Sequence, residues 1–147
     1  MDMTKKNESF PVHLLDNLHT EGAGYDVLRY IALPELFGQE SDTLLYFLGR
    51  RTARKLEIKT VEDIVHTFKA LGWGHLELIK EKNNYLLFHL KSDAVVLRLK
   101  ASFNTEFRLE SGFLAEALEM IKGKTCECTE SIHKRIHQIE FKVHYTE

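Results

Sequence analysis

The chain has 147 residues, of which 44% are hydrophobic and 29% are charged, a composition typical of a globular protein large enough to bury a core. The formal net charge is -2, so no basic field would recruit nucleic acid or an anionic membrane surface. No apolar run approaches the roughly 20 residues that span a bilayer, and the polar N-terminus lacks the apolar stretch of a secretion signal. We therefore expect a cytosolic protein whose two cysteines stay reduced.

The N-terminal part of the chain predicts helices in pieces. Within residues 10–37 a first piece over 11–19 carries apolar residues at helix spacing. Glycines within 22–25 are expected to break it, and a second helical piece follows. Pro34 is expected to interrupt that second piece, because proline lacks a backbone N–H and clashes with the preceding turn.

A longer helix is predicted over residues 41–56, with Ser41 or Asp42 as its N-cap. Gly49 and Ala53 are four residues apart, which predicts the close approach of another helix on that side. The apolar stripe is expected at Leu45, Leu48, Thr52 and Leu56, widened by Leu44 and Phe47. A solvated, basic C-terminal half is expected, with phosphate binding as the alternative, from Arg50, Arg51, Arg54 and Lys55.

The next helix should begin after Thr60 and end before Gly72, which is a typical residue just beyond a helix C-terminus. The hydrophobic period then changes from 3.6 to 2. Residues 73–92 predict a β-hairpin that turns at Asn83 and Asn84, since asparagine tolerates positive φ. Residues 94–101 alternate between apolar and polar side chains and predict a third strand.

The C-terminal part predicts one late helix over residues 110–123, followed by alternating segments over 124–132 and 136–145. The expected fold class is therefore α+β, with N-terminal helices packed against a mainly antiparallel sheet and one late helix before a C-terminal β-hairpin. Residues 1–9 are expected to be disordered, and residues 10–147 to form a single domain.

Two cysteines and two histidines crowd into twelve residues, at Cys126, Cys128, His133 and His137. Cys126 and Cys128 would share one face of a strand, about 6.6–7 Å apart at ~3.3 Å per residue. Two thiolates on one tetrahedral zinc lie only about 3.7–3.8 Å apart, given a Zn–S bond of ~2.3 Å. His133 is expected in a turn, and His137 at the start of a strand on its apolar face. We therefore interpret the cysteines as buried side chains facing a core, not as metal ligands.

The order of three motifs resembles a known fold. "LLYFLGRRTARKL", then "FKALGWGHLELI", then "GFLAEALEMIKGK" before a hairpin ending "IEFKV" is similar to the fold shared by TRAPP vesicle-tethering subunits, bacterial 4-vinyl reductase domains and haem NO-binding domains. From about Phe10 to Tyr145 the chain more closely resembles the small YslB-type proteins of Firmicutes. The resemblance implies a domain that often pairs through its N-terminal helices and sometimes holds an apolar ligand.

Matched residue by residue, the resemblance carries little chemistry. The 4-vinyl reductase domains have a cysteine two positions before the closing phenylalanine, where this chain has Ile139 ahead of Phe141. Their preceding turn has a glycine, where this chain has Lys134 and Arg135. No cofactor is therefore expected, and no catalytic or metal-binding residue is assigned.

These observations favour a non-enzymatic cytosolic module that binds a protein partner or an apolar small molecule. The alternative is a metal-dependent sensor or enzyme that uses Cys126, Cys128, His133 and His137. We also expect a homodimer built on the N-terminal helices, because residues 10–37 carry more apolar side chains than one buried face would use. The other possibility is that these helices fold back and bury both faces within one chain.

Overall fold

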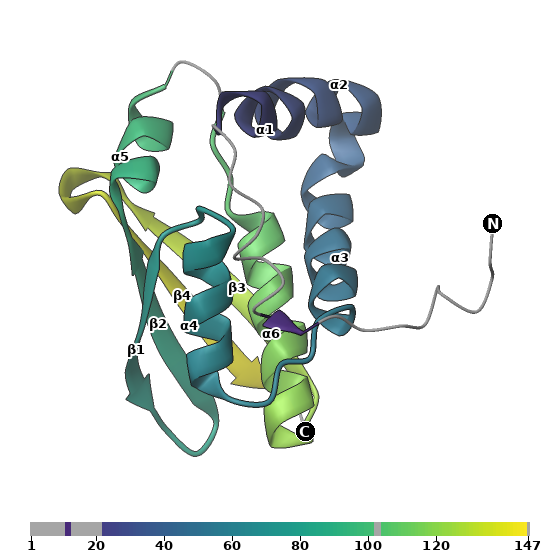
Figure 1. Cartoon of the computed structure of the whole chain (residues 1–147), viewed down its shortest axis with the longest axis vertical. Coiled ribbons are helices and arrows are strands. Elements are labelled where there is room, and N and C mark those ends of the chain that lie inside the picture. Colours follow the sequence, from purple (N-terminus) through teal and green to yellow (C-terminus); the bar gives the residue numbers. More distant parts are fainter. Residues whose placement is uncertain (1–10, 13–21, 102–103, 147) are drawn as a thin grey trace, which may run out of the picture.

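The computed structural model describes residues 11–12, 22–101 and 104–146, and it has the expected α+β architecture. Four antiparallel strands form one sheet in the order β1-β2-β4-β3. Helices α4 and α6 cover one face of the sheet, α3 packs on α6, and α1 and α2 lie across the end of α3 (Figure 1). In chain order the elements are α1 (Ala23–Val27), η3 (Leu28–Ala32), α2 (Leu33–Phe37), η4 (Gly38–Glu40), α3 (Ser41–Arg54), α4 (Val61–Ala70), β1 (His75–Glu81), β2 (Tyr85–Lys91), α5 (Asp93–Lys100), α6 (Arg108–Lys122), β3 (Cys126–His133), η5 (Lys134–Ile136) and β4 (Gln138–Tyr145).

The first described helix runs on from α1 through η3 into α2, so the interruption expected at Pro34 is wrong. The break expected within 22–25 concerns the end of a helical piece whose residues 13–21 lie outside the described ranges. The helix begins within the glycine-containing segment, at Ala23. Pro34 stands near the start of α2, directly after a π-helical turn, and such turns adjust the backbone hydrogen bonds inside a helix. In that turn, Leu33 N–H bonds to the carbonyl of Leu28. The helix predicted over 11–19 falls almost wholly outside the described residues, although Val12 lies in the core.

Helices α3 and α6 meet through a reciprocal pair of glycines, as the spacing of Gly49 and Ala53 predicts. A Cβ added to Gly49 would collide with the backbone carbonyl oxygen of Leu109 on α6. A Cβ on Gly112 of α6 would collide with the backbone carbonyl oxygen of Tyr46 on α3. Each glycine therefore admits the backbone of the other helix, and a side chain at either position would push the two helices apart.

The buried face of α3 differs from the predicted stripe. The close contact with α6 turns Leu45, Tyr46, Gly49 and Ala53 inward. Three other residues of the predicted apolar stripe, Leu44, Phe47 and Leu48, therefore point outward. The predicted caps are also wrong: Glu40 occupies the N-cap position without a side-chain hydrogen bond, and Ser41 is buried inside the helix.

The region from α4 to β2 follows the prediction. Thr60 and Asp63 form a capping box at the start of α4, and Gly72 adopts φ 74 after its end. The strands β1 and β2 then pair as an antiparallel hairpin around Asn83 and Asn84.

The third predicted strand is wrong, because residues 93–100 form helix α5. The Ser92 side chain accepts a hydrogen bond from Val95 N–H and caps the helix, with Asp93 in its first turn. Val95 and Arg98 point inward at helix spacing, whereas Leu97 is 71% exposed. The N-cap and the inward packing of Val95 and Arg98 together outweighed the alternating pattern, since β-branched residues lower helix propensity only slightly.

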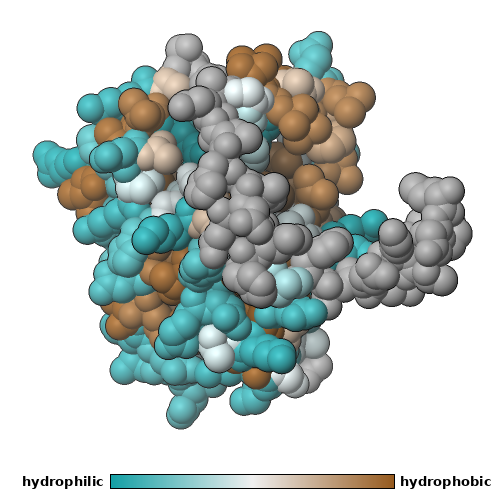
Figure 2. Space-filling view, in the orientation of Figure 1, coloured by the Kyte–Doolittle hydropathy of each residue, from teal (hydrophilic) through white to brown (hydrophobic). Residues whose placement is uncertain are grey.

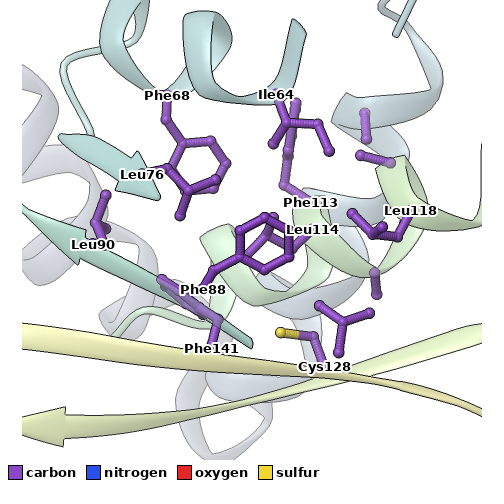
Figure 3. Packing of buried hydrophobic residues seen from close by; sticks show 14 of the residues in the cluster. Ile64, Phe68, Leu76, Phe88, Leu90, Phe113, Leu114, Leu118, Cys128 and Phe141 are labelled. Carbon is purple, nitrogen blue, oxygen red and sulfur yellow. The ribbon is translucent and has the colours of Figure 1, made fainter. Parts of the chain in front are cut away.

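The core lies between the sheet and the helices α4 and α6. Phe68, Trp73 and Phe113 meet edge to face with ring centroids 5.0–5.8 Å apart. Phe88 and Phe141 rise from the sheet toward α6, and the Cys128 side chain points into the same layer (Figure 3). This rigid body supports the N-terminal helices at one end of the molecule.

Candidate functional site

The N-terminal helices carry a large exposed apolar surface, which we call the apolar face. Its members are between 40% and 76% exposed and come from two segments: Val27, Leu28, Ile31 and Leu36, and then Leu44, Phe47 and Leu48. Figure 2 shows apolar side chains gathered over α2 and the upper part of α3. Large aromatic side chains bury roughly 150–250 Å² each. At the lower part of that range, taken because six of the seven are aliphatic, the seven present on the order of 600–700 Å². The largest apolar patch on an ordinary monomer is about 300–600 Å².

The same N-terminal helix turns polar side chains toward the core. Arg29 is 2% exposed and Glu110 is 0% exposed. Arg29 Nη1 and Nη2 donate to the two carboxylate oxygens of Glu110 at 2.8 and 2.5 Å. Arg29 Nε and Nη2 donate to the two carboxylate oxygens of Glu106 at 3.0 and 2.8 Å. One guanidinium thus holds two carboxylates bidentately, a geometry that suits its planar fork.

The electrostatics of this cluster keep Arg29 charged. Burial by itself lowers the pKa of Arg29, but the charge of Glu110 and the hydrogen bonds that Arg29 donates to Glu110 and Glu106 raise it. The net result is a pKa well above the ordinary arginine value. Burial also raises the pKa of Tyr25, whose hydroxyl accepts a hydrogen bond from Arg29 Nη1 at 2.9 Å.

The cluster extends to the core and to α5, and we call the whole the buried network: Tyr25, Asp26, Arg29, Trp73, Arg98, Glu106 and Glu110. Trp73 Nε1 donates to the Tyr25 hydroxyl at 3.1 Å, which connects the network to the aromatic core. Arg98 Nε donates to Asp26 Oδ1 at 3.3 Å, and the Arg98 guanidinium stands 5.7 Å from the Tyr25 ring centroid. Helix α1 therefore docks on the body through polar contacts, and the π-helical turn at Leu28–Ala32 turns both Arg29 and Tyr30 inward.

The structure does not bring the four Cys/His residues of the sequence cluster together. Cys126 and Cys128 are buried and face the core, as the strand alternation predicts. His133 is the last residue of β3, not a turn residue, and its Nε2 lies 3.0 Å from Glu140 Oε2. Cys128 and His133 are five residues apart along the strand, about 16 Å at ~3.3 Å per residue. Within residues 11–12, 22–101 and 104–146, no three His, Cys, Asp or Glu side chains are placed to hold a metal ion.

His137 is also not where the alternation predicts it. The strand β4 begins one residue later, at Gln138, and His137 closes the turn between β3 and β4 with φ 51. Histidine is among the residues that enter this left-handed region more readily than others.

Burial raises the pKa of Cys126 to about 11 and also raises that of Cys128, so both thiols are protonated at neutral pH.

The basic end of α3 is only partly solvated, so the prediction fails for Arg50. Its Nη2 lies 2.6 Å from Glu119 Oε1, and its Nη1 donates to the carbonyl oxygen of Cys126 at 3.0 Å. Arg54 Nε lies 3.5 Å from Glu116 Oε1. Arg50 therefore ties α3 to α6 and to the edge strand β3, whereas Arg51 and Lys55 remain exposed.

Sequence reasoning missed the buried network altogether. Its members are distant along the chain, and Arg29 and Glu110 are separated by 81 positions. One local signal was available: Glu106 and Glu110 are four residues apart, just before α6 and in its first turn, beside the apolar run that follows. That signal indicates a cation between two carboxylates, but it does not identify Arg29 as that cation.

The chain was compared with known proteins. The family model described as "Protein of unknown function (DUF2507)" matches residues 22–144. The "Uncharacterized protein YslB" of Bacillus subtilis is 30% identical over 129 residues, which cover 88% of this chain and 87% of that protein. The "Uncharacterized protein MJ1642" of Methanocaldococcus jannaschii is 22% identical over 107 residues, covering 73% of this chain and 65% of that protein.

Among solved structures, a vinyl-4-reductase family protein from Methanocaldococcus jannaschii is similar to this chain with a TM-score of 0.66. The two share 18% sequence identity, and the match covers 92% of this chain and 88% of that chain. The expected relation to the 4-vinyl reductase fold is therefore confirmed for the fold. In the described ranges, no helix combines the length and the apolar character needed to cross a membrane.

Proposed function

The chain belongs to the DUF2507 family, and we propose that it is a non-enzymatic, cytosolic interaction module that forms a homodimer through the apolar face. The observation that carries this proposal is the orientation of the first described helix. It buries Arg29 and Tyr30 and exposes Val27, Leu28 and Ile31. A helix that turns an arginine inside and three large apolar side chains outside needs a second surface to cover them.

The size of the apolar face supports a protein as its occupant. A standard-size interface takes about 800 Å² from each partner, and the apolar face presents on the order of 600–700 Å² by the side-chain areas above. A twofold dimer covers two such faces at once, because one self-complementary surface serves both subunits.

The chemistry of the buried network supports a structural role in place of a catalytic one. Every N–H group of the Arg29 guanidinium is taken up by Tyr25, Glu106 or Glu110. A residue that recognises a substrate would keep hydrogen-bond donors free for it.

The two cysteines are unpaired, buried thiols, which suits a reducing compartment. An apolar small molecule remains a prediction from the family resemblance.

The experiment is light scattering across micromolar concentrations on the full chain and on Phe47→Glu. The full chain should give twice its mass of 17.1 kDa, and Phe47→Glu should give a folded monomer whose melting temperature does not depend on concentration. Leu97→Glu is the matched control, because Leu97 is also an exposed large apolar side chain but lies on α5. A mass of 17.1 kDa that does not change with concentration would refute the homodimer.

A further inference from the structure

The residues on the exposed side of α3 are spaced symmetrically about the middle of the helix. Glu40, Leu44, Phe47, Leu48, Arg51 and Lys55 follow one another at spacings of four, three, one, three and four positions, which places them on one side of a helix. All six are exposed, and α3 with its two caps spans Glu40 to Lys55. The acidic residue stands at one end, the basic residues at the other, and the apolar residues between.

We propose that the apolar face pairs with the same face of a second copy through α3 helices that run antiparallel, with the twofold axis between Phe47 and Leu48. This inference rests on the proposed function and specifies the partner's orientation. Around that axis, Phe47 meets Leu48 of the second copy. Glu40 then lies opposite Lys55 of the second copy, and the reverse contact forms at the other end of the pair.

The distances along the helix are compatible with this pairing. Glu40 and Lys55 are fifteen residues apart, about 22 Å at 1.5 Å per residue, and the axis bisects that length. Antiparallel helices pack with their axes about 8–10 Å apart, which is within reach of a glutamate and a lysine side chain. Leu44 lies opposite Arg51 of the second copy, whose aliphatic stem can cover it while its guanidinium reaches solvent.

Charge also favours a second copy over another occupant. Within the described part of the chain, neither Glu40 nor Lys55 has an ion-pair partner of its own. A parallel arrangement would set the acidic ends together and the basic ends together, which is unfavourable. The antiparallel arrangement satisfies both ends with the same two residues. The segment from α1 to α2 contributes Val27, Leu28 and Ile31 to the same apolar face.

The test is a charge exchange measured by sedimentation equilibrium at low salt. Glu40→Lys and Lys55→Glu should each weaken the dimer roughly 10-fold, since each variant creates two like-charge contacts per dimer. The double variant Glu40→Lys/Lys55→Glu should return to within about 2-fold of the wild-type Kd. All these differences should shrink in 1 M salt, where the Debye length is about 3 Å.

Asp42→Lys is the matched control. It changes the same charge in the first turn of α3, but residue 42 lies on another side of the helix from Phe47. It should therefore leave the Kd within about 2-fold of wild type, since only the helix end is affected. If it weakens the dimer as much as Glu40→Lys, the effect comes from the helix itself and the antiparallel pairing is refuted.

Two further outcomes separate this inference from the proposed function. In the first, the wild type is a dimer that Phe47→Glu dissociates, but the double variant does not recover the wild-type Kd. That result would overturn the antiparallel pairing and leave the homodimer in place. A wild-type chain that stays monomeric would overturn both. Recovery in the double variant would support the pairing, because only a contact between these two residues compensates both reversals.

Discussion

Replacing Arg29 by methionine tests the buried network most directly. Methionine fills a similar volume but leaves Glu110, which is 0% exposed, without its bidentate partner. Removing one member of a buried ion pair costs about 3–5 kcal/mol, because the remaining charge is buried and uncompensated. For a chain of this size, 1 kcal/mol shifts the melting temperature by about 2–4 °C. We therefore expect Arg29→Met to melt on the order of 10 °C below wild type.

The loss should be local before it is global. The first described helix docks on the body through Tyr25 and Asp26 of α1 and Arg29 of η3, so the loss of Arg29 should release the segment from α1 to α2 first. Hydrogen exchange followed by mass spectrometry should show faster exchange over residues 24–37 and unchanged protection in β2 and β4. Equal acceleration throughout the sheet would contradict a local role.

A compensating variant makes the prediction falsifiable. Arg29→Met/Glu110→Leu removes both buried charges and keeps apolar volume at each position. It should recover most of the lost stability, because apolar replacements of a buried ion pair are often neutral or stabilising. Glu106, whose side chain is 18% exposed, can then take its hydrogen bonds from water. If the double variant loses the sum of the two single effects, Arg29 and Glu110 are not energetically coupled and the description of the network is wrong.

Two other predictions concern the helix contact and the thiols. Gly49→Leu should lower the free energy of unfolding by at least about 1–3 kcal/mol, because the new side chain overpacks against Leu109. The control Gly24→Ala lies in open space on a helix and should be neutral or stabilising. An unchanged melting temperature for Gly49→Leu would mean that its side of α3 is exposed. Cys126 and Cys128 should react slowly with a thiol reagent at pH 8, because burial raises the pKa of Cys126 to about 11 and also raises that of Cys128. Rapid labelling in native buffer, with no acceleration by denaturant, would contradict their placement.

The parts of the fold that were predictable depend on signals local in the chain. The capping box of Thr60 and Asp63, the positive φ of Gly72 and the asparagines of the hairpin each act within a few residues. The α5 segment shows where two local signals compete. Its alternation favoured a strand, while Ser92 as N-cap favoured a helix, and the helix formed. Neither signal has a magnitude large enough to decide without the surrounding packing.

The candidate site was less predictable, because it depends on contacts between distant residues. The sequence shows that α3 has apolar residues on two sides, but it does not show which side is buried. The approach of α6 to Gly49 decides that question, and it leaves Phe47 and Leu48 outside. Arg29 likewise reads as an ordinary helix-surface residue until Glu106 and Glu110 are placed beside it.

The buried network and the apolar face form one arrangement, because they occupy opposite sides of the same helix. A half-turn of that helix about its axis would bury Val27, Leu28 and Ile31 against the body and remove the surface on which a partner could bind. An apolar contact would tolerate such a rotation, since hydrophobic packing is non-directional. The bidentate bonds of Arg29 do not tolerate it, because they require the guanidinium to face Glu106 and Glu110. A buried ion pair adds little net stability over an apolar replacement, so the role we infer for Arg29 is to fix orientation. It excludes the competing arrangement in which the first described helix turns its apolar side onto the body.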